Sequence, residues 1–179
     1  ENGIMLANQL AQIDGHGQFF KSSGVEAKDA FILGSDGRLR YFESGNGNMA
    51  VNEFKGSENG RYYYFGADGL TVTGLQTING RQLYFDDHGQ QMKDAFYTNQ
   101  SGQRFYFNAL TGDLVKGDFI YTSASSSFTP DDNAAGSYQG DSHLWYYADS
   151  QGQIVTGFQT INGHLQYFDD ISGQMITNR

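Results

Sequence analysis

Residues 73–87 read TGLQTINGRQLYFDD and residues 156–170 read TGFQTINGHLQYFDD, so two stretches of one chain are near copies. Weaker versions of the pattern recur about every 21 residues, and a fixed period of this length is typical of repeats that stack on their neighbours to bury their apolar faces. Paired aromatic residues mark each repeat: Phe19-Phe20, Tyr41-Phe42, Tyr64-Phe65, Tyr84-Phe85, Tyr106-Phe107, Tyr146-Tyr147 and Tyr167-Phe168. The sequence predicts an all-β fold, a β-solenoid.

The inner part of each repeat has the pattern of a β-hairpin. In residues 75–85, two short runs of β-forming residues flank Asn79-Gly80, a dipeptide typical of two-residue hairpin turns because both positions take positive φ. The corresponding dipeptides elsewhere are Asp14-Gly15, Asp36-Gly37, Asn59-Gly60, Ser101-Gly102 and Asn162-Gly163, with Asp141-Ser142 in the sixth repeat. A second glycine after each aromatic pair is expected to turn the chain toward the next repeat.

The period divides the chain, taken as a single domain over residues 1–179, into about seven stacked hairpin repeats. Their expected boundaries are near residues 9–29, 30–52, 53–73, 74–94, 95–117, 118–157 and 158–179. The sixth repeat is about twice the usual length, and its surplus, residues 121–140, has a loop composition. This insertion is either a flap over a neighbouring groove or a tolerated surface loop. The pattern starts and stops inside a repeat, which predicts a piece of a longer protein.

Strand alternation assigns the aromatic residues to two faces. An apolar residue also recurs on the first strand of each hairpin: Leu10, Phe31, Phe54, Leu75, Phe96, Phe119 and Phe158. Together with the second ring of each aromatic pair, these residues are expected to form the inward-facing stack. The first ring of each pair then points to the opposite face, toward solvent or a ligand.

The chain carries a formal net charge of −9, and its 11 lysine and arginine residues form no cluster. Such a chain cannot neutralise many phosphates, so nucleic acid is not an expected partner. An anionic lipid surface is disfavoured for the same reason, and no run of about 20 apolar residues predicts a membrane span. The lack of cysteine excludes disulfides and thiolate metal sites. A neutral ligand fits this composition best.

The sequence offers no convincing catalytic constellation. Asp86-Asp87, Asp131-Asp132 and Asp169-Asp170 are adjacent carboxylates, and neighbours on a strand or turn face different ways. A glycosidase pair must instead converge across a cleft, and Asp after an aromatic pair is typical of turns. The histidines occupy non-equivalent repeat positions: His16, His88, His143 and His164. We therefore predict no catalytic residue, no metal site and no cofactor.

Sugar binding is the remaining chemistry that the residues suggest. An outward tyrosine can pack on the apolar CH face of a pyranose, while neighbouring Gln, Asn and Thr side chains hydrogen-bond the ring hydroxyl groups. The alternative is that Tyr and Thr occur because they are good strand residues. Composition alone leaves both interpretations open.

The pattern of residues 74–80 followed by Leu83-Tyr84-Phe85-Asp86, with its copy at residues 157–169, closely resembles the YG-type glucan-binding repeats of glucansucrases of the dextransucrase type from lactic acid bacteria. The resemblance covers all seven repeats, tightly in the fourth and seventh and loosely in the first and sixth. It implies a β-solenoid module, called domain V in those enzymes, that binds α-glucan beside a separate catalytic barrel. The chain itself would be non-catalytic, and its parent a secreted glucosyltransferase acting on sucrose.

In that family a sugar pocket is built from one repeat and the start of the next, with a tyrosine stacking on a glucosyl unit. Carried over, the resemblance implies a main pocket in the fourth repeat: Gln76, Thr77, Tyr84, Gln91, Lys93 and Tyr97. A second candidate set lies in the seventh repeat: Gln159, Thr160 and Tyr167. A third set is Thr98, Tyr106 and Lys116. Phe19 replaces the platform tyrosine in the first repeat and lacks its hydroxyl, so we expect fewer working pockets than repeats.

Three other functions stay open at this stage. Choline-binding modules belong to the same superfamily, but choline cages favour tryptophan through cation–π contacts, and Trp145 is the only tryptophan here. Toxin-like binding to host glycans and a structural spacer with vestigial pockets are the other two. We carry forward a monomeric, extracellular or cell-surface module that binds α-glucan and isomalto-oligosaccharides. Several weak pockets on one polymer would supply its affinity.

Overall fold

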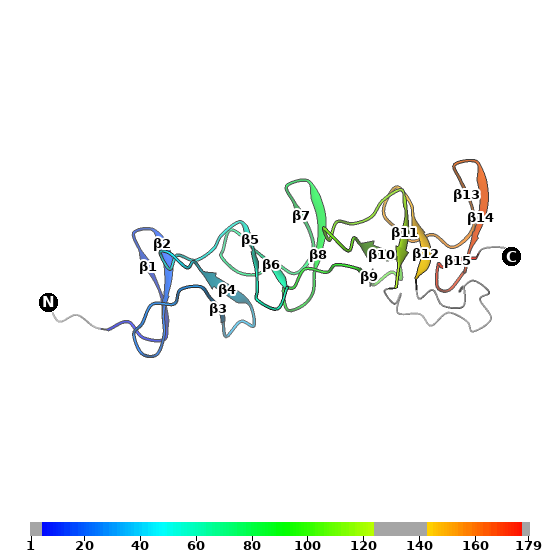
Figure 1. The fold of residues 1–179 in the computed structure, drawn as a ribbon. Helices are drawn as coiled ribbons and strands as arrows, with labels where there is room; N and C mark the ends of the chain where they lie inside the picture. Colours follow the sequence, from blue (N-terminus) through cyan, green and yellow to red (C-terminus); the bar gives the residue numbers. More distant parts are fainter. Residues whose placement is uncertain (1–4, 124–142, 177–179) are drawn as a thin grey trace. The chain divides into compact units, whose positions relative to one another are not determined.

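The computed structural model describes residues 5–123 and 143–176, and the regular secondary structure in these ranges is all β. The strands are β1 (Gln9–Ile13), β2 (His16–Phe20), β3 (Ala30–Leu33), β4 (Leu39–Phe42), β5 (Glu53–Gly56), β6 (Tyr62–Phe65), β7 (Gly74–Ile78), β8 (Arg81–Phe85), β9 (Ala95–Thr98), β10 (Arg104–Phe107), β11 (Asp118–Thr122), β12 (Leu144–Ala148), β13 (Gly157–Ile161), β14 (His164–Phe168) and β15 (Met175–Ile176). They pair in chain order into hairpins, each a small sheet of its own, with β15 added to the last (Figure 1). The chain is a β-solenoid of hairpin repeats, as the sequence predicts.

The chain divides into two compact units, which are described separately. The first unit takes in residues 1–76 and 85–91 and contains the hairpins β1–β2, β3–β4 and β5–β6. The second takes in residues 77–84 and 92–179 and contains β9–β10, β11–β12 and β13–β14–β15. In Figure 1 the hairpins of the first unit follow one another from blue to cyan, and those of the second from green to red.

Two kinds of turn close the hairpins. Both residues of the turn dipeptide have positive φ in three hairpins, as predicted: Asp14-Gly15, Asn79-Gly80 and Asn162-Gly163. In three others only the glycine does, and the predicted two-residue turn is wrong: Asp36-Gly37, Asn59-Gly60 and Ser101-Gly102. These dipeptides lie inside five-residue loops, residues 34–38, 57–61 and 99–103, in which a tighter turn precedes the left-handed glycine.

The residue before the dipeptide distinguishes the two kinds of turn. A β-branched residue, which extends the strand up to the turn, precedes each two-residue turn: Ile13, Ile78 and Ile161. A polar residue precedes the dipeptide in the five-residue loops: Ser35, Glu58 and Gln100. In residues 34–38 the Gly34 amide donates to the Arg38 carbonyl at 2.9 Å, and the Gly37 amide donates to the Gly34 carbonyl at 3.0 Å. The other two loops repeat both bonds.

A backbone hydrogen bond joins each of the second to sixth repeats to the repeat before it. The segment after a hairpin donates an amide to a carbonyl on the second strand of the preceding hairpin. The donor and acceptor pairs are Met49 and Gly17, Thr71 and Leu39, Gln91 and Tyr62, Leu114 and Gln82, and Ile154 and Arg104, at distances between 2.7 and 3.1 Å. The five donors, here called return residues, also bridge to the second strand of their own hairpin. Each therefore lies between two successive hairpins and bonds to both.

The glycine two residues before the return residue is required by packing as well as by backbone conformation. Gly89 has a φ of +79°, and a Cβ placed on it would lie 2.6 Å from the Cβ of Thr71, the return residue of the preceding repeat. The same close approach recurs where Gly47, Gly69, Gly152 and Gly173 lie against Glu26, Met49, Leu114 and Ile154. The turn predicted at this glycine is thus also the point where neighbouring repeats come closest.

The second rings of the aromatic pairs form the core, as predicted for five repeats: Phe42, Phe65, Phe85, Phe107 and Phe168 are at most 1% exposed. The sixth repeat departs from this pattern. There Phe119 pairs with Tyr147, and Ala148 occupies the buried position that a ring takes elsewhere. Its aromatic pair is therefore displaced by one residue, and Tyr146 is buried opposite Ile120.

The apolar residues of the first strands lie opposite the first rings of their own hairpins, so the predicted inward stack is correct only in part. Phe31 and Phe54 still contact second rings, because their ring centroids lie 6.3 and 6.4 Å from those of Phe65 and Phe85 in the following hairpins. Cross-strand partners share a face of a hairpin, and Phe31 pairs with Tyr41 while Phe96 pairs with Tyr106. The first-strand residue therefore lies on the face of the first ring. Three of these residues are exposed: Leu10 at 44%, Leu75 at 54% and Phe158 at 72%.

Tyr41 and Tyr106 are buried first rings, contrary to the expectation that this ring faces solvent or a ligand. The Tyr41 hydroxyl donates to the Asp29 carboxylate at 2.6 Å, and the Tyr106 hydroxyl donates to Asp94 at 2.5 Å. Both aspartates have positive φ, which Asp tolerates better than most residues. The bond to Asp29, with burial, raises the pKa of Tyr41 to about 12. Burial, with the bond to Asp94, raises the pKa of Tyr106 to about 12.

The insertion expected at residues 121–140 begins later than predicted. Tyr121 and Thr122 belong to β11, where they pair with Trp145 and Leu144 of β12. The expected turn at Asp141-Ser142 and the flap interpretation concern residues 124–142 and lie outside the described residues.

We expect Gly89→Ala to lower thermal stability more than Gly60→Ala. The two glycines have φ of +79° and +77°, so both variants carry the left-handed strain of about 1–2 kcal/mol. Nothing lies within 4 Å of a Cβ at residue 60, whereas the contact with Thr71 should add about 1–3 kcal/mol of overpacking at residue 89. Thermal unfolding followed by circular dichroism measures the difference. Equal melting temperatures would contradict close packing of the repeats at this glycine.

We expect Tyr41 and Tyr106 to ionise later than the other tyrosines in an alkaline titration followed by tyrosinate absorbance. Their folded-state pKa values are raised, so their contribution to stability is complete below pH 10 and is lost as the pH rises toward 12. The double variant Tyr41→Phe, Tyr106→Phe should lack the late step. A single step near pH 10, with an unchanged circular dichroism spectrum, would contradict the buried hydrogen bonds.

Candidate functional site

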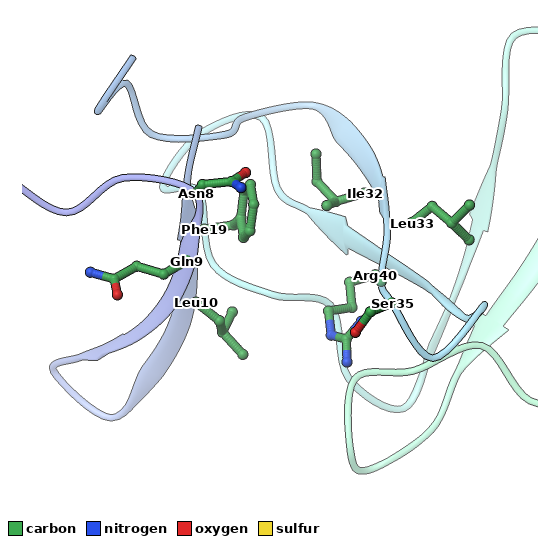
Figure 2. A pocket seen from close by; sticks show the side chains of 9 residues that line it. Asn8, Gln9, Leu10, Phe19, Ile32, Leu33, Ser35 and Arg40 are labelled. Carbon is green, nitrogen blue, oxygen red and sulfur yellow. The ribbon is translucent and has the colours of Figure 1, made fainter. Parts of the chain in front are cut away.

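A cavity of about 370 Å³ lies between the first two hairpins, within the first unit. Figure 2 shows Leu10 and Phe19 of the hairpin β1–β2 across this cavity from Ile32 and Arg40 of the hairpin β3–β4. The remaining lining residues are Asn8, Gln9, Leu33, Gly34 and Ser35. We call this cavity the first-hairpin pocket. The lining mixes apolar side chains with polar groups, and polar groups that can fix the orientation of a ligand are typical of small-molecule sites.

Arg40 and Asp36 form the polar edge of the first-hairpin pocket. The Arg40 Nη2 donates to Asp36 Oδ2 at 2.9 Å, and Nη1 lies 3.5 Å from Oδ1. The hydrogen bond from Arg40 lowers the pKa of the Asp36 carboxyl. Gly34 makes this arrangement possible, because a Cβ there would collide with the side chains of both Arg40 and Asp36. The guanidinium is thereby held at the rim of the cavity.

The sequence analysis does not predict this pocket, because it expects a working pocket to need the tyrosine that the first repeat lacks. Phe19 lacks the hydroxyl of a platform tyrosine, but the polar groups come from the second hairpin and not from the first. The spacing of Asp36 and Arg40 is the available signal in the sequence. This spacing is informative only if residues 34–38 form a five-residue loop, and the sequence analysis predicts a two-residue turn there.

The residues of the main predicted pocket divide between the two units: Gln76 and Gln91 in the first, and Thr77, Tyr84, Lys93 and Tyr97 in the second. Within the second unit, the ring centroids of Tyr84 and Tyr97 lie 4.1 Å apart. The predicted platform and the predicted wall are therefore in direct contact. At the equivalent positions of the first unit, Phe19 and Ile32 border the first-hairpin pocket instead.

Gln76 and Gln159, predicted as polar contacts to the sugar, both reach back to their own backbone. The Gln76 Nε2 donates to the Thr73 carbonyl at 2.7 Å, and the Gln159 Nε2 donates to the Thr156 carbonyl at 2.8 Å. The threonine that follows each glutamine is exposed. In the two hairpins whose sequences are near copies, these side-chain amides therefore bond the backbone just before the first strand.

Gln91 and Lys93 connect repeats. Gln91 is a return residue and is 7% exposed. The Lys93 Nζ donates to the Leu110 carbonyl at 3.2 Å, and the equivalent Lys28 of the first repeat donates to the Gly45 carbonyl at 3.1 Å. Both lysines therefore bond the turn of the following repeat, which is a structural role that the sequence reasoning does not assign to them.

In the seventh repeat, Thr160 and Tyr167 lie on one face of the hairpin, because Tyr167 pairs with Phe158, two residues from Thr160. Gln159 lies on the opposite face. The Tyr167 hydroxyl donates to the Asp170 carboxylate at 3.0 Å, which raises the pKa of Tyr167. The structure thus brings together two of the three residues of the second predicted set.

In the third predicted set, Tyr106 is 5% exposed, and its expected outward orientation is wrong. The sixth hairpin covers this face and joins Tyr106 in one apolar cluster. Sequence reasoning misses Asp94, which accepts hydrogen bonds from Tyr106 and, at 2.6 Å, from Thr122. Thr98 and Lys116 are exposed.

Two of the paired carboxylates act in turns, as predicted. Asp86 accepts two amides of its own turn at 2.8 and 2.9 Å. Asp169 accepts the Ser172 amide, and this bond lowers the pKa of the Asp169 carboxyl. Asp131-Asp132 lies outside the described residues.

Residues 5–123 and 143–176 contain no group of three or more His, Cys, Asp and Glu residues that could hold a metal ion. They also contain no helix long and apolar enough to cross a membrane.

The fold is similar to that of two solved structures from Streptococcus pneumoniae. For the modular autolysin LytC in complex with a synthetic peptidoglycan ligand, the TM-score is 0.66 at 20% identity, over 94% of this chain and 33% of that chain. For CbpJ from strain TIGR4, the TM-score is 0.65 at 16% identity, over 91% of this chain and 50% of that chain. At these identities the similarity concerns the fold alone.

Curated relatives are similar in sequence. Glucosyltransferase-S of Streptococcus mutans serotype c is 40% identical over 162 residues, which are 90% of this chain and 10% of that protein. Glucosyltransferase-I of Streptococcus downei is 38% identical over 163 residues, which are 91% of this chain and 9% of that protein. The chain thus spans about a tenth of the length of these relatives. The choline-binding repeat matches residues 2–54, 72–119 and 136–179, well over half of the chain. This protein therefore belongs to the choline-binding repeat family.

Proposed function

We propose that the chain is a non-catalytic carbohydrate-binding module and that its ligand is an α-glucan of the dextran type. The similarity to two glucosyltransferases supports this proposal, because the chain corresponds to about a tenth of each and consists of hairpin repeats. The rest of such a protein would carry out the reaction. The parent is then a secreted or surface-associated glucosyltransferase, and the module keeps the growing glucan near the active site.

The observation that carries the proposal is the two-sided character of the first-hairpin pocket. Leu10, Phe19 and Ile32 provide an apolar wall, and Arg40 provides hydrogen-bond donors at the edge. A pyranose has the matching character, with apolar CH faces and a rim of hydroxyl groups. The cavity volume of about 370 Å³ falls in the range of about 300–1,000 Å³ that is typical of ligand sites.

The proposal includes weaker subsites at the positions implied by the sequence. In the second unit, the half-buried rings of Tyr84 and Tyr97 present a joint aromatic surface with Thr77 exposed on the same hairpin as Tyr84. In the seventh repeat, Tyr167 and Thr160 share a face. Each subsite would hold a sugar weakly, and one long polymer would gain affinity by engaging several of them.

Choline is the second candidate ligand, because the family is named for it. A choline cage needs aromatic faces around the ammonium group, each within about 6 Å. The rings of Trp145 and Tyr121 lie 4.7 Å apart at 32° and pack against each other, so no ammonium group fits between them. The first-hairpin pocket has one aromatic lining residue, Phe19. Both observations favour the glucan.

We expect dextran in a native gel to retard the chain and the variant Phe19→Ala to migrate faster than wild type in that gel. Phe19 lines the pocket, so its loss removes the apolar wall. Val25→Ala is the matched control, since Val25 is an exposed apolar residue outside the pocket. The retardation should persist at about 1 M salt, where charge interactions are screened beyond about 3 Å. No retardation of the wild type would contradict the proposed function.

We expect dextran to bind the chain about 10²- to 10⁴-fold more tightly than isomaltotriose does, because a polymer reaches several subsites at once. Isothermal titration calorimetry with both ligands tests this expectation. Tyr84→Ala should weaken dextran binding and leave the first-hairpin pocket intact, since the two sites lie on different hairpins. Equal affinities for polymer and trisaccharide would show that only one subsite works.

A further inference from the structure

The polar edge of the first-hairpin pocket carries more donors than its internal contacts use. A guanidinium has five N–H donors, and Arg40 directs two of its N–H groups toward Asp36. The other three N–H groups are not used by this ion pair, and Arg40 is one of the residues that line the cavity. We propose that Arg40 determines the specificity of this pocket: it donates hydrogen bonds to the hydroxyl groups of a neutral sugar, and the pocket rejects quaternary ammonium ions. This inference rests on the proposed function and assigns one of its ligand contacts.

Two neighbours fix the position of the Arg40 guanidinium. Asp36 accepts its Nη2 proton at 2.9 Å, and the backbone of Gly34 lies so close that only a hydrogen fits in place of a side chain. The pKa of Asp36 is lowered, so this pair stays charged at neutral pH. The planar guanidinium presents its remaining donors in a rigid fork geometry, and Asp36 balances its charge, which suits a neutral ligand. Backbone conformation does not require glycine at residue 34, since its φ is not positive.

The same residues explain why an ammonium ion fits poorly. Phe19 is the sole aromatic residue among those that line the cavity, and Leu10, Ile32 and Leu33 are aliphatic. A quaternary ammonium group has no lone pair with which to accept a hydrogen bond, so it leaves the N–H donors of Arg40 that Asp36 does not use without a partner. Unsatisfied donors at a partly buried edge cost free energy that a sugar hydroxyl would recover. Asp36 already has a partner in Arg40 and offers the cation little compensation.

Site-resolved NMR titration of the whole 179-residue chain tests the inference, with isomaltotriose and choline chloride as separate probes. The reporters are the backbone amides of Gly34 and Ser35, which line the pocket. The variants are Arg40→Met, which keeps much of the length and loses every donor, and Gly34→Ala, which displaces the guanidinium. Arg61→Met is the control, because Arg61 is exposed and does not line the cavity.

We expect isomaltotriose to shift the Gly34 and Ser35 signals, Arg40→Met to weaken that binding about tenfold or more, and Gly34→Ala to weaken it in the same direction. Arg61→Met should match wild type, and choline should leave both signals in place.

Two results would overturn the inference and keep the proposed function. One is that isomaltotriose shifts signals elsewhere in the chain but not at these amides, and the other is that Arg40→Met binds it with equal affinity. Shifts of these signals by choline would also overturn it. Absence of any saccharide shift, together with free migration through dextran, would overturn the proposed function and the inference together.

Discussion

The backbone hydrogen bond from each return residue to the hairpin before it is the interaction on which the rest of the structure depends. A two-stranded hairpin is marginally stable alone in water, and the return residue adds a further strand contact to two hairpins at once. Thr71 shows the consequence, because it is 1% exposed and its buried amide would be unpaired without Leu39. A glycine packs closely against a return residue of the preceding repeat, for example Gly89 against Thr71. This close packing explains why glycine recurs two residues before the return residue.

The same bond fixes the spacing of neighbouring hairpins, and side-chain size then decides whether a cavity remains between them. In the second unit Tyr84 meets Tyr97, and their rings fill the available space. In the first unit the smaller Ile32 stands where Tyr97 does, and the first-hairpin pocket lies beside Phe19. A tyrosine hydroxyl is therefore a poorer guide to a cavity in this fold than the size of the residue on the next hairpin. The sequence motif with the strongest resemblance and the first-hairpin pocket fall in different repeats for this reason.

The period and the aromatic pairs were enough to predict an all-β solenoid of hairpins, and the dipeptides Asp14-Gly15, Asn79-Gly80 and Asn162-Gly163 placed three of the turns correctly. The five-residue loops were not predicted, because Asp36-Gly37 and Asn79-Gly80 look alike until the preceding residue is considered. The inward stack was predicted correctly only in part, because alternation along one strand does not say which residue lies opposite on the other, and register decides that. Burial of Tyr106 could not be foreseen either, since it depends on the next hairpin and on Asp94. The sugar-binding residues implied by the family stay predictions.

The five backbone hydrogen bonds from the return residues all end on second strands, and none of these bonds involves a hairpin tip. Leu39 and Thr71 are joined across 32 positions of sequence, and Arg104 and Ile154 make the same bond across 50. The additional residues enter between Thr122 and Leu144, beyond the last paired positions of β11 and β12. The tip of β11–β12 is thus a place where sequence length changes while the bond between Arg104 and Ile154 is kept. For protein engineering, this makes that tip a natural position to graft foreign peptides, leaving the repeat-to-repeat backbone bonds as an unmodified scaffold.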